Sequence, residues 1–62
     1  MEKQIIVTDL NLMEIFDLPC VTSINKAGDG VRVRIRLAPG RFVYVGYGGM
    51  IWQDENGAWH VN

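Results

Sequence analysis

The chain has 62 residues, 48% of them hydrophobic, and its formal net charge is −1 at pH 7. A chain of this length forms one small domain, residues 1–62, whose hydrophobic core only narrowly outweighs the conformational entropy lost on folding. The slightly acidic balance argues against a general polyanion binder, because such a protein needs a surplus of basic residues to displace counterions.

The first twenty residues predict an edge strand followed by one short helix. Residues 4–7, QIIV, are rich in β-branched side chains and favour the strand. Asn11 with Glu14 three positions later approximates a capping box, which marks the start of a helix. The helix then has one apolar face, made of Leu12, Ile15 and Phe16, with Met13 beside it. Pro19 ends the helix, because the residue before a proline is pushed out of helical geometry.

A β-hairpin from Val31 to Tyr47 forms the centre of the chain. In its first strand aliphatic residues alternate with arginines, so the aliphatic side chains share one face and the arginines the other. The arginines are Arg32, Arg34 and Arg36. Pro39-Gly40 then predicts a reversal, since proline presets φ for the first turn position and glycine accepts a positive φ at the next. The second strand, residues 42–47, is apolar on both faces, which favours a central strand covered on both sides.

Two registers of this hairpin are open. A loop of two or four residues places Ile35 opposite Tyr44 and leaves Val43, Val45 and Tyr47 among the arginines. A three-residue loop with a bulge exchanges the two sets and places Tyr44 on the arginine face. The register therefore decides whether the arginine face is aliphatic or aromatic.

Turn signals recur about every nine residues, which is typical of a β-meander. Besides Pro39-Gly40 they are Asp29-Gly30, Gly48-Gly49 and Asn56-Gly57. The segments between them predict further strands at residues 21–25, 50–53 and 58–61. We expect an α+β fold in which the short N-terminal helix packs on an antiparallel β-meander of four to five strands. The helix should cover the face formed by Val33, Ile35 and Leu37.

The sequence contains no catalytic or metal-binding motif of useful specificity. His60 is the only histidine and would need Asp54 or Glu55 across the last hairpin to act as a general acid or base. Cys20 follows the proline that ends the helix and has no neighbouring base, so a buried structural thiol is the better interpretation. One Cys and one His forty residues apart do not make a metal site. We expect no enzymatic activity, no metal and no cofactor.

Two features that the sequence lacks indicate the cellular compartment of the protein. A single cysteine excludes an intrachain disulfide, so nothing points to an oxidising environment. No apolar run reaches the length of a transmembrane helix, and the run near the N-terminus is too short for a signal peptide. We therefore expect a cytoplasmic protein with no membrane partner.

The arginine stripe is the strongest candidate site. Like charges two residues apart on one face repel one another unless an anionic group lies over them. Arginine also contacts carboxylates and phosphates in bidentate fashion and stacks on aromatic rings. The expected binding residues are Arg32, Arg34, Arg36, Arg41, Tyr44, Tyr47 and Trp52. The simpler interpretation is a solvated outer face whose charges discourage edge pairing.

Two functions fit such a surface. The first is a small non-enzymatic accessory protein, by analogy like those carried by bacteria or phages, which binds another protein or forms a homodimer. The second is a single-stranded nucleic-acid binder, in which arginines contact phosphates and the aromatic residues stack on bases.

Overall fold

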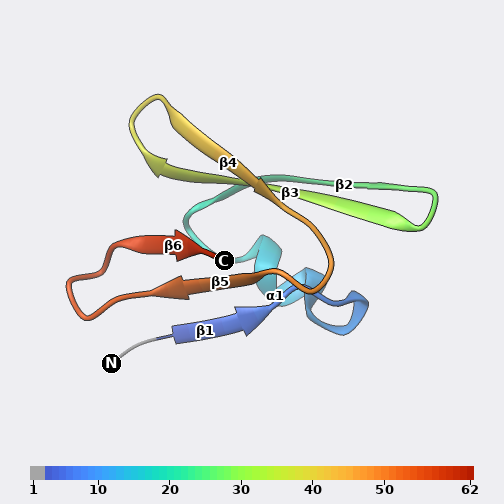
Figure 1. The fold of residues 1–62 in the computed structure, drawn as a ribbon, viewed down its shortest axis with the longest axis horizontal. Helices are drawn as coiled ribbons and strands as arrows, with labels where there is room; N and C mark the ends of the chain where they lie inside the picture. Colours follow the sequence, from blue (N-terminus) through green and yellow to red (C-terminus); the bar gives the residue numbers. More distant parts are fainter. Residues whose placement is uncertain (1–2) are drawn as a thin grey trace.

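The computed structural model describes residues 3–62, which form six strands and two short helical segments (Figure 1). The strands are β1 (Lys3–Ile6), β2 (Val21–Ala27), β3 (Gly30–Ala38), β4 (Arg41–Val45), β5 (Met50–Gln53) and β6 (Trp59–Val61). A 3₁₀ turn, η1 (Asp9–Asn11), leads directly into the helix α1 (Leu12–Phe16). The predicted α+β class, with a short helix and antiparallel strands, is confirmed.

The strands form two three-stranded antiparallel sheets rather than one meander. One sheet has the order β2-β3-β4 and the other β1-β5-β6. The expected edge strand near the N-terminus is β1, which pairs with β5. The two sheets lie over one another, with α1 beside them (Figure 1). A domain this small thereby covers the aliphatic face of each sheet with the other sheet.

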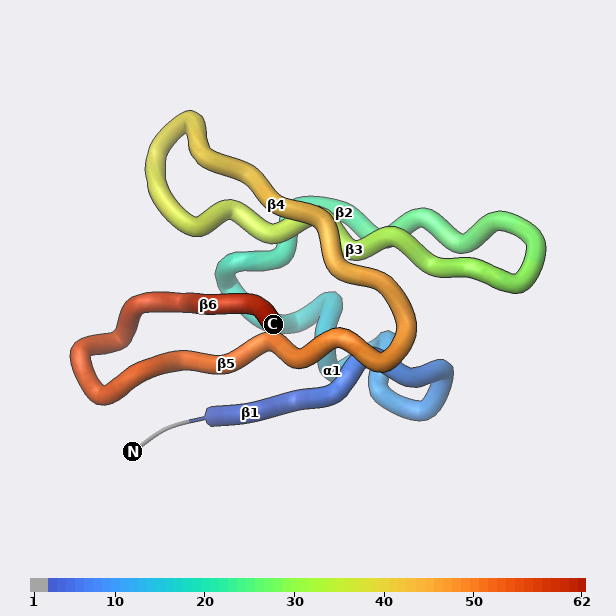
Figure 2. The backbone as a smooth tube through the Cα atoms, in the orientation of Figure 1, coloured from blue at the N-terminus to red at the C-terminus, as the bar shows by residue number. Residues whose placement is uncertain are grey.

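The Gly48-Gly49 signal marks the point where the chain leaves one sheet and enters the other. Figure 2 shows the backbone descending from β4 to β5 through this segment. Gly48 has φ of 84°, and the Gly49 amide donates to the Gly46 carbonyl at 3.0 Å. Val7 fixes the crossing, since its amide donates to the Gly49 carbonyl at 2.8 Å and its carbonyl accepts from the Gly48 amide at 3.0 Å.

The core lies between the sheets and receives one side chain from α1. Its fully buried members are Val7, Ile15, Val33, Ile35 and Ile51. Ile15 belongs to the same buried cluster as Val33 and Ile35, and α1 packs against β2. Met13 and Phe16, however, point to solvent. The sequence predicted that the helix would cover the aliphatic face of β3, but the second sheet covers most of it.

Two local predictions are wrong. The Asn11 side chain makes no capping bond, because its Nδ2 donates to the Ile6 carbonyl at 2.8 Å and ties η1 to the end of β1. The strand after Pro39-Gly40 is not central: β3 is the middle strand and β4 lies at an edge. The outward residues of β4 are apolar because they pack against arginine side chains, as described below.

None of the helices formed by residues 3–62 is long and apolar enough to cross a membrane.

Candidate protein-binding surface

The central hairpin adopts the register with a bulge. Arg34 lies opposite Tyr44 and Arg36 opposite Phe42, while the register shifts between Arg36 and Ala38. Because directly opposed residues share a face, both aromatic side chains join the arginines. Of the two registers left open by the sequence, the structure adopts the one with an aromatic arginine face.

Strand β2 adds small polar residues to the same face. Ser23 lies opposite Arg34 and Asn25 opposite Arg32. A bulge at Thr22 sets this register, and the Thr22 hydroxyl donates to the Arg34 carbonyl at 3.2 Å. We call the resulting surface the Arg/aromatic face. It comprises Ser23, Asn25, Arg32, Arg34, Arg36, Phe42 and Tyr44.

The arginines and aromatic rings of this face are interleaved. The guanidinium carbon of Arg34 lies 3.9 Å from the centroid of the Phe42 ring, and that of Arg32 lies 5.3 Å from the centroid of Tyr44. Such cation–π contacts contribute about 0.5–1 kcal/mol at exposed sites and about 2 kcal/mol when desolvated. They restrict the arginine side chains to defined positions, which reduces the entropy that a partner would have to remove on binding.

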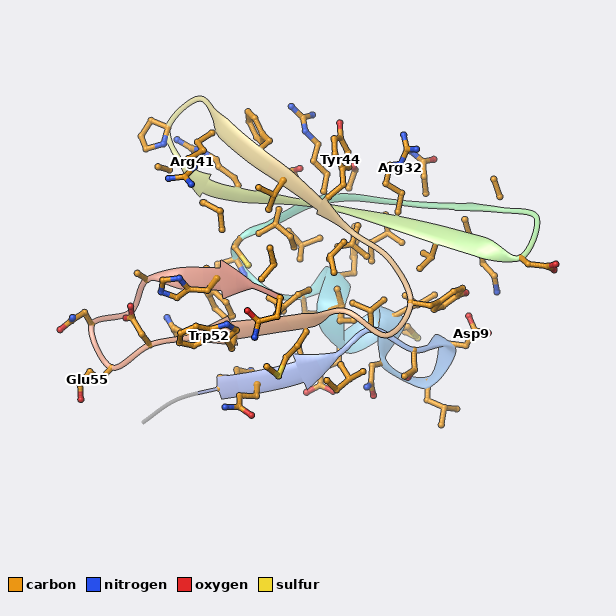
Figure 3. All side chains as sticks on the ribbon, viewed as in Figure 1. Asp9, Arg32, Arg41, Tyr44, Trp52 and Glu55 are labelled. Atoms are coloured by element: carbon orange, nitrogen blue, oxygen red, sulfur yellow. The ribbon has the colours of Figure 1, made fainter. Side chains whose placement is uncertain are left out.

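Within residues 3–62, no acidic group neutralises this face. Among residues 3–62, the cations within 4 Å of a carboxylate are Lys26 and His60, and no arginine is among them. Arg34 is half-buried, and its Nε is buried without a hydrogen-bond partner. An unpaired buried donor costs free energy, and no acceptor in the described part of the chain holds the Arg34 side chain in place through this atom. Figure 3 shows Arg32 and Tyr44 projecting away from the second sheet.

The other expected binding residues lie elsewhere. Arg41 pairs with Ala38 and, by strand alternation, lies on the opposite face of β4 from Phe42 and Tyr44. In Figure 3 it lies near the tip of the β3–β4 hairpin. Tyr47 follows β4 and binds Asp9, whereas Trp52 lies in the other sheet. The structure thus brings together Arg32, Arg34, Arg36 and Tyr44. It also adds Phe42, which the bulged register could have indicated in the sequence.

Tyr47 belongs to a polar cluster that joins three parts of the chain. Its hydroxyl donates to Oδ1 of Asp9 in η1, and Lys26 at the end of β2 donates to the same oxygen at 3.2 Å. The hydrogen bond from Tyr47, followed by that from Lys26, lowers the pKa of Asp9 below its usual 3.8. The hydrogen bond to Asp9 raises the pKa of Tyr47 and that of Lys26. This cluster has a structural role, since its charges are satisfied internally.

Asp9→Asn should therefore lower the melting temperature at neutral pH more than at acid pH. A carboxyl whose pKa is depressed by folding stabilises the protein above its unfolded pKa, and this contribution is lost as the pH falls through the folded value. The melting-temperature difference between wild type and variant should shrink between pH 7 and about pH 2. Asp29→Asn, in the exposed turn before β3, is the control and should show no such change. A difference that stays constant with pH would contradict the assigned role of Asp9.

Trp52 and His60 stack on one another in the second sheet. Their ring centroids are 4.2 Å apart with an interplanar angle of 20°, and the indole Nε1 is buried without a partner. His60 Nε2 donates to Asp54 Oδ2 at 2.9 Å, and the other Asp54 oxygen accepts from the amides of Asn56 and Ala58 at 2.9 and 3.0 Å. These contacts, first that with His60, lower the pKa of Asp54. No serine, threonine or cysteine in the described chain is hydrogen-bonded to His60, so this pair organises the β5–β6 turn.

Cys20 is buried, and burial raises the pKa of its thiol. A high pKa disfavours the nucleophilic thiolate. Cys20 is one of the residues that line an open groove of about 300 Å³, together with Arg36, Leu37 and Trp59. Within residues 3–62, no group of three or more His, Cys, Asp or Glu side chains could hold a metal ion.

The chain matches no protein-family model, no curated protein and no solved structure.

Proposed function

We propose that this chain is a small non-enzymatic interaction protein whose Arg/aromatic face binds an acidic protein surface. The observation that carries the proposal is the position of Arg34. Its guanidinium stacks on Phe42, no carboxylate of residues 3–62 forms an ion pair with it, and its buried Nε has no hydrogen-bond partner there. A stacked guanidinium with free donors suits bidentate contact with an aspartate or glutamate. Arginine and tyrosine are also among the residue types enriched at binding hot spots.

The same geometry favours a protein over a single-stranded nucleic acid. Stacking of bases requires accessible ring faces. Arg34 and Arg32 already lie over Phe42 and Tyr44, and each therefore covers one face of a ring. Trp52, a third candidate for stacking, lies in the other sheet and stacks on His60. The net charge of −1 adds little attraction for a polyanion.

The test compares arginines from two faces of the same hairpin. Arg34→Glu should weaken binding of a fluorescent peptide of alternating Glu and Tyr by at least about tenfold, since a bidentate charge-assisted pair is lost. Arg34→Lys retains the charge but loses the planar fork, so it should give an intermediate loss. Arg41→Glu makes the same charge change on the opposite face of β4 and is the matched control. Fluorescence anisotropy would report affinity, and circular dichroism would verify that each variant is folded.

Equal losses for Arg34→Glu and Arg41→Glu would show that only net charge matters and would contradict the proposal. The same would follow from wild-type protein that fails to bind the peptide. Tighter binding of an oligothymidine than of the peptide, falling steeply with salt, would instead favour the nucleic-acid function.

A further inference from the structure

A second exposed surface lies on η1 and α1. The large apolar side chains with the greatest exposure in residues 3–62 are Leu10 at 95%, Met13 at 86% and Phe16 at 62%. They are spaced three residues apart, so they lie on one side of the helical segment. We call these three residues the helix patch. Contiguous apolar side chains exposed in this way mark interaction sites in small proteins.

The helix patch is exposed because α1 has only five residues, and only one of them is buried in the core. Ile15 is fully buried in the core, and Met13 and Phe16 lie on the other side of the helix. Phe16 has the helical spacing of a core residue relative to Leu12 and Ile15, yet it remains 62% exposed. Where a local pattern is broken in this way, a functional surface is the expected reason.

Acidic residues surround the helix patch. Asp17 is four residues after Met13 and therefore lies next to it on the helix surface, and Glu14 is exposed on the adjoining side. Neither of these carboxylates forms an ion pair with the described residues. Residues 4–25 contain no lysine or arginine, and Lys26, which reaches η1 from β2, is paired with Asp9 rather than with Glu14 or Asp17. The patch therefore combines an apolar centre with an uncompensated negative rim.

The Arg/aromatic face has the complementary composition. It presents Arg32, Arg34 and Arg36 with no acidic residue, and its rings are also exposed, Phe42 by 38% and Tyr44 by 59%. We propose that the helix patch of one copy docks on the Arg/aromatic face of a second copy, with Glu14 and Asp17 bound by the arginines. This inference rests on the proposed function of that face, and it identifies the acidic partner surface as one carried by the chain itself.

The two surfaces are far enough apart to be used at once. In Figure 3, Arg32 and Tyr44 project on one side of the first sheet, whereas Asp9 of η1 lies beyond its other side. A contact between two different surfaces is heterologous, so each copy can accept one neighbour and donate to another. Association should thus continue past the dimer.

The contact is expected to be weak. A standard interface covers about 800 Å² on each partner, which is about a fifth of the 4297 Å² surface of this chain. The helix patch is three side chains wide, so its contact falls in the range below about 1,200 Å² in total that is typical of transient complexes.

The test uses two variants that each block one surface. Arg34→Glu blocks the Arg/aromatic face. Met13→Ser removes the central apolar side chain of the helix patch without adding charge, at a position that is 86% exposed and does not support the core. Sedimentation equilibrium from about 10 µM to about 1 mM should show that the wild-type average mass rises past that of a dimer. Each variant alone should remain a monomer. An equimolar mixture should form dimers and nothing larger. The intact helix patch of the Arg34 variant can dock on the intact Arg/aromatic face of the Met13 variant, and the two remaining surfaces are both blocked.

Three results would overturn the inference. They are wild-type protein that stays monomeric, self-association of either variant at the wild-type level, and a mixture that stays monomeric. Self-association of Arg34→Glu alone would point to patch-to-patch dimers instead. The peptide experiment separates this inference from the proposed function. Wild type that binds the acidic peptide through Arg34, combined with a monomeric mixture, would leave the proposed function standing while the inference fails.

Discussion

Ile35→Ala is expected to lower the free energy of unfolding by about 2–5 kcal/mol, the usual cost of truncating a fully buried isoleucine. Ile35 has no exposed surface, and it lies in the central strand between Val21 and Val43. At about 0.05–0.15 kcal/mol per residue, a domain of this size has only about 3–9 kcal/mol of total stability. The variant should therefore be largely unfolded at room temperature or melt far below the wild type.

Ile6→Ala is the matched control for this loss. This substitution removes the same atoms as Ile35→Ala, but from a side chain that is 44% exposed on the outer face of β1. Its cost should stay below about 1 kcal/mol, within the range of strand propensities. Urea denaturation followed by circular dichroism would measure both. Similar losses for the two variants would contradict the division into an inner and an outer face.

The alternation in β3 was sufficient to predict both faces of the central strand. Val33 and Ile35 are buried, and the arginines between them lie on the outer side, because successive side chains of a strand point in opposite directions. The same rule could not fix the pairing with β4. A one-residue bulge at Leu37, just before the two-residue Pro39-Gly40 loop, inverts every partner, and the composition of the turn does not indicate this bulge. Phe42 was therefore missing from the predicted site.

The division into two sheets could not be read from local patterns. A glycine pair such as Gly48-Gly49 serves equally well in a hairpin and in a crossing between sheets. The distinction depends on whether β5 pairs with β4 or with β1, and this is a long-range choice made by packing. The exposure of Phe16 could not be predicted from local spacing either, because it depends on which elements pack against α1. Tyr47 and Trp52 were included in the predicted site because of their residue type, but Tyr47 binds Asp9 and Trp52 stacks on His60, away from the Arg/aromatic face.

Gly49→Ala should destabilise the fold by about 1–3 kcal/mol, the cost of forcing an extra carbon into a packed site. A Cβ atom at Gly49 would overlap Cγ2 of the buried Val45 and lie 3.2 Å from the Gly46 carbonyl oxygen. The backbone cannot shift to relieve this overlap, since hydrogen bonds to Gly46 and Val7 hold Gly49 on both sides.

Gly30→Ala is the control for the Gly49 substitution and is expected to act in the opposite direction. The nearest atom to an added Cβ there is 3.8 Å away, and Gly30 does not have a positive φ. Alanine at such a position should be neutral or stabilise by about 0.4–1 kcal/mol, because it restricts the unfolded chain. Thermal melting of both variants would show opposite shifts. Equal shifts in melting temperature would contradict close packing at Gly49. The chain would then cross from β4 to β5 without the tight contact that excludes a side chain at this position.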